Sequence, residues 1–144
     1  MKIQTSRFGE IEIDAGTIIE VPGGLIGFPE EQKYLLIRHK PDSPFYWFQA
    51  LNDPDLAFVI VNPAVFKPDY QIPYPASLLT AMKASAPEDL SLFVIVTIPR
   101  GNPKGMTANL LGPLVVNTPA RLGKQLVLDE NKYSHRYPLM SPSS

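Results

Sequence analysis

Three carboxylates near the start of the chain have a spacing that could support chemistry. Glu10, Glu12 and Asp14 alternate with Ile11 and Ile13, so on a strand they would project from one face. Two such groups can act as acid and base, but a catalytic pair usually converges from separate elements into a pocket. We therefore expect either the solvated outer face of a hairpin or an acidic strip that docks a basic partner.

Other groups that hold metals or transfer protons are scarce. His39 and His135 are the only histidines, and neither has metal-ligand spacing around it. The chain has no cysteine, which excludes disulfides, thiolate zinc sites and cysteine nucleophiles. A cleft containing Lys67, Asp69 and Tyr70 is the remaining possibility for an unusual enzyme. Because no recognisable arrangement of catalytic groups is present, we predict a protein that is not an enzyme and that uses no cofactor or metal.

Two glycine-rich segments, residues 23–27 and 100–105, are candidates for phosphate-binding loops. In neither is a glycine followed by lysine and then serine or threonine, and neither has the dinucleotide-binding pattern. We interpret both segments as turns.

Four consecutive aromatic residues occupy positions 45–48. A strand here places large rings on both of its faces. One face can fill the core, and the other is either covered or open for binding, because aromatic side chains are enriched at the centres of interfaces. Phe45 and Trp47 share a face and are candidate partner contacts, with core packing as the alternative.

An amide and a proline interrupt an apolar run in residues 106–128. The run predicts two strands around a turn. Pro113 cannot donate to a β ladder, so it requires an edge, a bulge or a strand break. Asn109 needs hydrogen-bond partners if it is buried, and it is either a structural amide at this irregularity or a partner contact.

The elements that must position these residues are short and mostly extended. Apolar residues that alternate on both sides of a turn at 7–9 predict a half-buried hairpin. A helix is expected over 76–84, because its leucines and methionine share a helical face. Runs rich in β-branched and aromatic residues predict further strands at 18–21, 34–38, 45–51, 57–61 and 90–98.

Sixteen prolines are spread between these runs, which suits many short strands. No repeat or domain boundary is evident. We therefore predict a mainly β, single-domain, small antiparallel β-barrel-like fold with one or two short helices. The domain is expected over residues 1–138, with a flexible C-terminal tail at 139–144.

Composition restricts the class of protein further. The chain has 144 residues, of which 44% are hydrophobic and 19% charged, as in ordinary soluble domains. It has neither a secretory signal pattern nor an apolar run long enough to span a bilayer. We expect a cytoplasmic protein with no membrane association.

Charge is unevenly distributed although the net charge is only −1. Residues 1–31 contain six acids and two bases (net −4), and residues 95–144 contain six bases and two acids (net +4). A weakly basic end without clustered Lys and Arg is a poor nucleic-acid footprint. We therefore predict no direct nucleic-acid binding.

Several short strings resemble the flagellar assembly factor FliW family, in its order and at about its spacing. The longest lies in residues 107–128, where TANLLGPLVVN is followed by GKQLVL. The similarity extends from Ser6 to Pro138, with departures at Ala50, where the family often has serine, and at residues 140–144. The other strings are FGEIE at 8–12, GLIGF at 24–28, PFYWFQ at 44–49, DPDLAF at 53–58, NP at 62–63 and PDY at 68–70.

The resemblance implies a small β-barrel-like fold with a short helix and a function without chemistry. FliW-like proteins bind CsrA, an RNA-binding translational repressor, and they also bind newly made flagellin, which competes for the same factor. Accumulated flagellin frees CsrA to repress flagellin synthesis, and export of flagellin returns the factor to CsrA and relieves repression. The resemblance also implies that CsrA inhibition need not mimic RNA.

No motif assigns partner contacts to residues. The candidates remain Glu10, Glu12, Asp14, Phe45, Trp47 and Asn109. A small-ligand or carbohydrate-binding β-barrel without catalysis is the alternative, and a deep pocket with converging polar groups would distinguish it.

Overall fold

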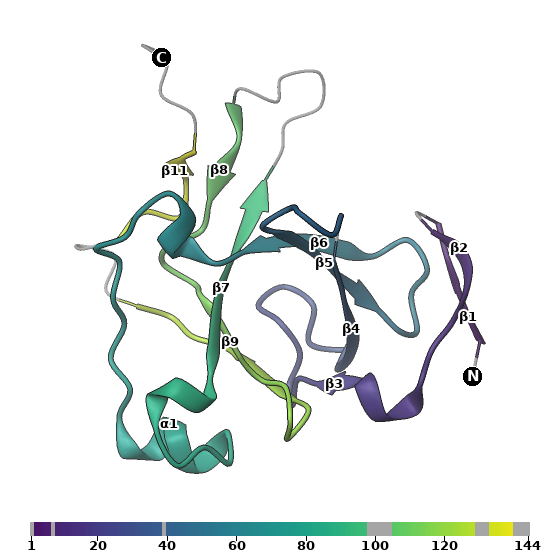
Figure 1. Cartoon of the computed structure of the whole chain (residues 1–144), viewed down its shortest axis with the longest axis horizontal. Coiled ribbons are helices and arrows are strands. Elements are labelled where there is room, and N and C mark those ends of the chain that lie inside the picture. Colours follow the sequence, from purple (N-terminus) through teal and green to yellow (C-terminus); the bar gives the residue numbers. More distant parts are fainter. Residues whose placement is uncertain (1, 7, 39, 98–104, 129–132, 140–144) are drawn as a thin grey trace.

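Strands make up most of the regular structure in the computed structural model (Figure 1), which describes residues 2–6, 8–38, 40–97, 105–128 and 133–139. His39, residues 98–104 and residues 140–144 of the expected tail lie outside the described residues. The strands are β1 (Lys2–Thr5), β2 (Gly9–Glu12), β3 (Ile19–Glu20), β4 (Lys33–Arg38), β5 (Phe45–Ala50), β6 (Ala57–Val61), β7 (Ser91–Thr97), β8 (Thr107–Ala108), β9 (Leu114–Asn117), β10 (Leu122–Gln125) and β11 (Tyr137–Pro138). The helices are α1 (Ala76–Ala81) and the short 3-10 helices η1 (Ala15–Thr17), η2 (Pro63–Val65) and η3 (Pro87–Asp89).

Seven strands close into a barrel. Its strand order is β3, β4, β5, β6, β7, β9, β10 and back to β3. Neighbours are antiparallel except β3 and β10, which are parallel and meet at Glu20 and Leu122. Closure pairs backbone groups that an open sheet would leave at its edges. The predicted mainly β, barrel-like fold is confirmed, with one parallel pair that the sequence did not indicate.

The barrel closes along β7, where one strand edge serves two partners. Residues 91–93 of β7 pair with β9, and residues 96–97 pair with β8. Between them the Asn109 N–H donates to the Ile95 carbonyl at 2.9 Å. The chain then leaves the sheet until β9 begins at Leu114, directly after Pro113. This confirms the strand interruption that the proline required.

Side chains fill the barrel interior. Ile19, Tyr34, Phe48, Ile60 and Leu114 point inward from neighbouring strands and are at most 2% exposed. The rings of Tyr34 and Phe48 stack with their centroids 4.5 Å apart. A small barrel filled in this way is a packed core. Its interior gives no support to the alternative of a ligand held inside the barrel.

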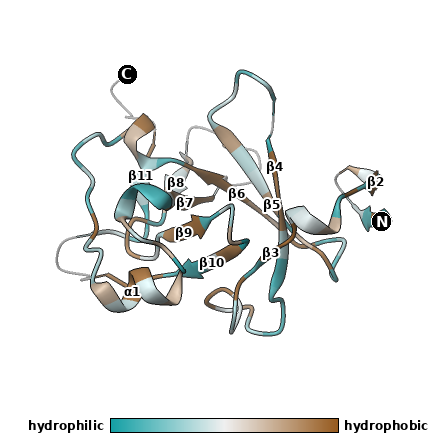
Figure 2. Ribbon diagram, turned by 60° about the horizontal axis from the view of Figure 1, so that its bottom comes forward, coloured by the Kyte–Doolittle hydropathy of each residue, from teal (hydrophilic) through white to brown (hydrophobic). Residues whose placement is uncertain are grey.

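A second core lies on the outer face of the barrel. Val94 of β7 and Val115 of β9 are buried there with Leu78 and Met82 from the α1 segment. Figure 1 places α1 beside β7 and β9, and Figure 2 shows hydrophobic residues on α1 and on β9. Because these strands are apolar on both faces, the outer face requires such a cover. No helix in the described ranges has the length and apolar character that a membrane crossing needs.

The hairpin formed by β1 and β2 is a separate two-stranded sheet, at the opposite end of the molecule from α1 (Figure 1). Ile3 pairs with Ile11, as the alternation predicted. Gly9 has a φ of 70°, which glycine adopts without steric cost. The ring of Phe8 lies edge-on to Trp47, with centroids 6.1 Å apart. This contact attaches the hairpin to the outer face of the barrel.

Candidate functional site

Glu10 and Glu12 form an acidic strip on the exposed face of β2. The hairpin register places them beside Gln4 and Lys2 of β1. Gln4 Nε2 donates to Glu10 Oε2 at 2.8 Å, and Lys2 Nζ lies 3.8 Å from Glu10 Oε1. Part of the strip's charge is therefore compensated within the hairpin, and the strip is smaller than the sequence suggested.

Asp14 does not continue the acidic strip. β2 ends at Glu12, and Asp14 is the residue that caps η1, where its Oδ1 accepts from the Gly16 N–H at 2.8 Å. The prediction that three acids share one strand face is wrong for Asp14. A carboxylate that caps a turn competes effectively with a continuing strand. Asp14 is nevertheless exposed, and its role in partner binding stays a prediction.

Phe45 and Trp47 lie on the outer face of β5. Phe45 packs against the outer core, and Trp47 stands between Ile37 of β4 and Val59 of β6 in the strand register. Both are half-buried, and Phe8 covers part of Trp47. The packing alternative therefore accounts for much of their surface, while partner contact through the remainder is untested.

The hairpin places the acidic residues Glu12 and Asp14 near the part of the barrel that carries Trp47. A cavity of about 340 Å³ lies between the hairpin and β4, and Glu12, Asp14, Phe8 and Ile37 line it. Ile37 is the β4 partner of Trp47. Carboxylates therefore border an apolar hollow beside the tryptophan.

Asn109 has a clear structural role. Its Oδ1 accepts from the N–H groups of Leu111 at 3.1 Å and Gly112 at 2.9 Å. These bonds hold the turn that separates β8 from β9. The residue lies beside β8, which is separated from β5 by β6 and β7. Asn109 is therefore not part of the group formed by the hairpin and Trp47.

An exposed apolar pair was missed in the sequence. Ile26 is 60% exposed and Val127 is 72% exposed. Gln125, two residues before Val127, links the two segments, because its Oε1 accepts from the Ile26 N–H at 2.8 Å. Its Nε2 donates to the Gly112 carbonyl at 3.0 Å. The structure confirms the predicted turn at residues 23–27, where Gly24 has a φ of 71° and a Cβ would collide with the Phe28 carbonyl.

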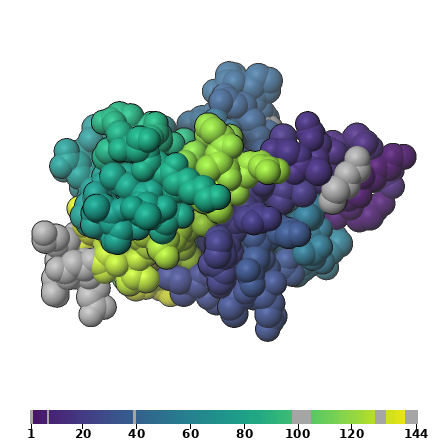
Figure 3. Space-filling model, turned by 90° about the horizontal axis from the view of Figure 1, so that it is seen from below, coloured from purple at the N-terminus to yellow at the C-terminus, as the bar shows by residue number. Residues whose placement is uncertain are grey.

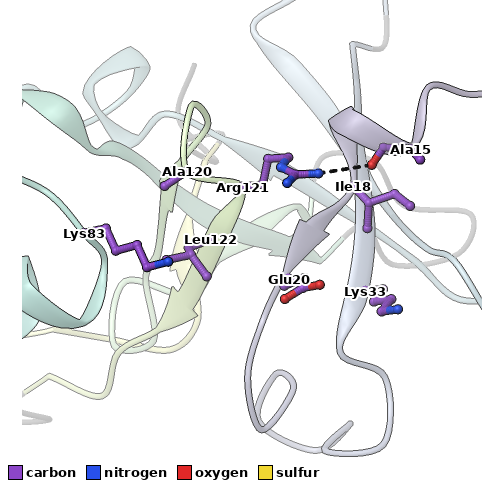
Figure 4. A pocket seen from close by; sticks show the side chains of 8 residues that line it. All are labelled: Ala15, Ile18, Glu20, Lys33, Lys83, Ala120, Arg121 and Leu122. Carbon is purple, nitrogen blue, oxygen red and sulfur yellow. Dashed lines mark hydrogen bonds between the residues drawn. The ribbon is translucent and has the colours of Figure 1, made fainter.

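A basic cavity of about 360 Å³ is the second site that the sequence did not reveal. It lies between β3, the end of α1 and the β9–β10 turn, and Figure 4 shows its lining. Lys33, Lys83 and Arg121 supply three cations, and Glu20 supplies one carboxylate. These residues are scattered through the sequence, so only the barrel topology brings them together.

Asn117 joins two walls of the basic cavity. Its side chain is 5% exposed, and its Nδ2 donates to the Met82 carbonyl at 2.8 Å and to the Lys83 carbonyl at 3.4 Å. Its Oδ1 accepts from the Ala120 N–H at 3.3 Å. One amide therefore ties the end of α1 to the β9–β10 turn.

The Lys67, Asp69 and Tyr70 group has no catalytic geometry. Tyr70 is buried and its hydroxyl donates to the Leu110 carbonyl at 2.6 Å. Burial raises the pKa of Tyr70 far above its ordinary value, so the phenol keeps its proton. Lys67 pairs with the exposed Asp69 at 3.3 Å. Within the described ranges, no group of three metal-binding side chains gathers.

These features define a class of protein. It is a small closed β-barrel with a partly covered outer face and with charged and apolar sites on its surface.

Comparison with known proteins identifies the family. Residues 2–139 match the family described as FliW protein. The flagellar assembly factor FliW of Magnetococcus marinus is 39% identical over 99% of this chain and 87% of its own, and that of Alkaliphilus metalliredigens is 43% identical over 97% and 86%. A crystal structure of the flagellar assembly factor FliW superposes with a TM-score of 0.90 at 33% identity and covers all of both chains. The chain belongs to the FliW family of flagellar assembly factors.

Proposed function

We propose that this chain is a partner switch that binds the repressor CsrA and, in competition, newly made flagellin. Flagellin in excess occupies the factor and leaves CsrA free to repress flagellin synthesis. When flagellin is exported, the factor returns to CsrA and repression is relieved. Such a switch needs only exclusive binding and suitable affinities, because mass action sets the distribution of the factor between its partners.

Membership of a family of flagellar assembly factors is the observation that carries the proposal. The surface agrees with a protein that acts by binding. Charged groups border an apolar hollow beside the hairpin, and Ile26 and Val127 expose apolar side chains on another part of the barrel. Exposed apolar residues next to polar ones are common in protein interfaces.

The charge distribution argues against inhibition of CsrA by imitation of RNA. An RNA mimic needs a row of negative groups, but the acidic strip has two carboxylates and one of them already contacts Lys2. A docked factor would instead act beside the RNA surface, by steric overlap or by repelling the approaching strand. A titration in which RNA fully excludes the factor from CsrA would contradict this part of the proposal.

Calorimetric titration tests the switch directly. The purified protein is titrated with CsrA, with flagellin, and with CsrA after it has been loaded with flagellin. We expect binding in the first two titrations and suppression in the third. The absence of heat change with either partner, at two temperatures to exclude an enthalpy of zero, would refute the proposal.

The acidic strip is tested by charge reversal. The double variant Glu10→Lys and Glu12→Lys should lower the association rate with a basic partner by about tenfold at low salt, because complementary charge steers encounter. The matched control is Glu30→Lys with Asp42→Lys, which makes the same change in net charge at exposed positions. Equal association rates for the two double variants would remove the strip as a contact.

A further inference from the structure

We propose that the basic cavity is a docking site for an acidic segment of a partner protein, held by Lys33, Lys83 and Arg121. The inference rests on the proposed protein-binding function, and it adds the place and the chemistry of one contact. Figure 3 shows the site from outside, where the β9–β10 turn lies between the α1 segment and the segment that carries η1 and β3.

The three cations are available for a ligand. All three are exposed residues, and none of them forms an ion pair with another described residue. Arg121 Nη1 makes one long hydrogen bond, 3.4 Å to the Ala15 carbonyl, which leaves its other donors open (Figure 4). Glu20 offsets one charge. The cavity therefore keeps a positive excess that a carboxylate-bearing segment complements.

Two of the cations occupy backbone positions that favour glycine. Lys83 has a φ of 55° and Arg121 a φ of 58°, and within the described ranges these are the non-glycine residues with positive φ. Lys83 follows α1, where its N–H donates to the Thr80 carbonyl at 3.1 Å in a helix-ending position usually filled by glycine. Both strained residues line the same cavity. Backbone strain often persists at functional sites, so the positive φ of two cations that line one cavity indicates that these cations bind a ligand.

The walls that carry these cations are fixed in advance. Asn117 joins the end of α1 to the β9–β10 turn through its buried amide. The Arg121 carbonyl accepts from the Glu20 N–H at 2.9 Å, which fixes the turn to β3. A site whose walls are held by such bonds loses little conformational entropy when a ligand binds.

The composition of the site favours a protein segment over a nucleic acid. Single-stranded nucleic acid binds along grooves that combine many cations with aromatic stacking platforms. The lining here has three cations, one carboxylate and no aromatic ring. The adjoining cavity shares Lys83 and includes Glu88, so a phosphate chain would be repelled there, whereas a protein segment can follow an acidic residue with a basic one.

A peptide titration tests the site without a known partner. The probe is an acetylated and amidated hexaglutamate peptide, added at low salt to isotope-labelled protein and followed by backbone amide shifts. We expect the Lys33, Lys83 and Arg121 amides to shift and the shifts to disappear at high salt. No shift of these amides at millimolar peptide would overturn the proposal. A hexauridylate RNA that shifts them at lower concentration would overturn it in favour of a nucleic-acid site.

Glycine substitutions separate binding from stability. Lys83→Gly and Arg121→Gly remove a cation and relieve strain together, so each should raise the Tm by about 2–4 °C. Their combination should weaken the hexaglutamate peptide about fivefold or more. Lys40→Gly is the control. Lys40 is exposed, has no positive φ, and follows the end of β4, whereas Lys33 lies at the start of that strand. A double variant that is stabilised and binds the peptide as wild type would overturn the inference.

The same variants separate this inference from the proposed function. If CsrA or flagellin binds the wild type, the double variant Lys83→Gly and Arg121→Gly should weaken at least one of them by about fivefold. Unchanged affinity for both would show that the site serves neither, and would overturn the inference while the switch stands. If neither protein binds the wild type, the proposed function fails, and the peptide titration alone decides the site.

Discussion

Asn117→Ala should be among the more damaging single substitutions at a polar residue of the described chain. The side chain is 5% exposed and makes two hydrogen bonds of 2.8 and 3.3 Å and one long contact of 3.4 Å. Its removal leaves the Met82 carbonyl and the Ala120 N–H without these partners. With about 1 kcal/mol for each of the two shorter bonds and about 1–2 kcal/mol for stranded buried groups, the loss is about 3–4 kcal/mol.

Thermal unfolding measures this loss. At about 3 °C per kcal/mol for a domain of this length, the Tm should fall by about 9–12 °C. Asn62→Ala is the matched control, because Asn62 caps η2 from an exposed position, where its Oδ1 accepts from the Ala64 N–H at 2.9 Å. Loss of a single exposed cap costs about 1 kcal/mol. A Tm decrease for Asn117→Ala no larger than that for Asn62→Ala would refute the reasoning.

A second variant isolates the donor side of the amide. Asn117→Asp keeps the size and the acceptor of Asn117 but loses the N–H groups that reach Met82 and Lys83. At neutral pH it also places a carboxylate against a carbonyl oxygen, so it should destabilise at least as much as alanine. Protonation supplies one donor again, and because the folded state disfavours the carboxylate, the difference from wild type should shrink as pH falls toward about 4, where an unfolded aspartate ionises.

Further predictions concern two buried tyrosines and one glycine. Tyr70→Phe removes the 2.6 Å hydrogen bond to the Leu110 carbonyl and should cost about 1–2 kcal/mol in denaturant unfolding. Tyr34→Phe should cost almost nothing, because the Tyr34 hydroxyl has no hydrogen-bond partner among the described residues. Burial, with a smaller contribution from Glu31, raises the pKa of Tyr34 to about 12. Since the unfolded phenol ionises near pH 10, the free energy of unfolding should fall as pH rises from about 10 to 12. Tyr34→Phe should reduce that fall when unfolding is followed across this range. Gly112→Ala should destabilise the fold by about 1–3 kcal/mol. The added Cβ would lie 2.9 Å from Gln125 Nε2 and 3.0 Å from Asn109 Nδ2. Calorimetric unfolding that matches wild type would contradict this packing.

The sequence predicted strand positions well because these depend on local pattern. Alternation around residues 7–9 gave the hairpin, and the apolar runs gave β4 to β7 with small shifts at their ends. The helix was predicted too long, since Lys83 adopts a positive φ and ends it. Nothing local indicated that β7 would share one edge between β8 and β9, or that β3 and β10 would be parallel, because strand partners are chosen by the packing of the whole barrel.

The candidate sites were predicted less well for the same reason. Residues close in sequence, such as Glu10 and Glu12, are visible as a pattern, but Asp14 could not be assigned to a cap without the turn that follows it. Lys33, Lys83 and Arg121 are far apart in sequence, and no spacing rule connects them. Sites assembled from separate elements depend on topology, which periodicity does not determine.

The segment that most strongly resembles the family is also the segment that closes the barrel. Asn109 holds the turn between β8 and β9, Pro113 marks the start of β9, and Gln125 ties β10 to two neighbouring segments. Each unusual residue of this run therefore has a structural task at the seam. A resemblance carried by such residues is strong evidence for the fold. It gives weaker guidance to the contact surface. The charges of the hairpin and of the basic cavity belong to side chains that barrel closure does not require to be of a particular type.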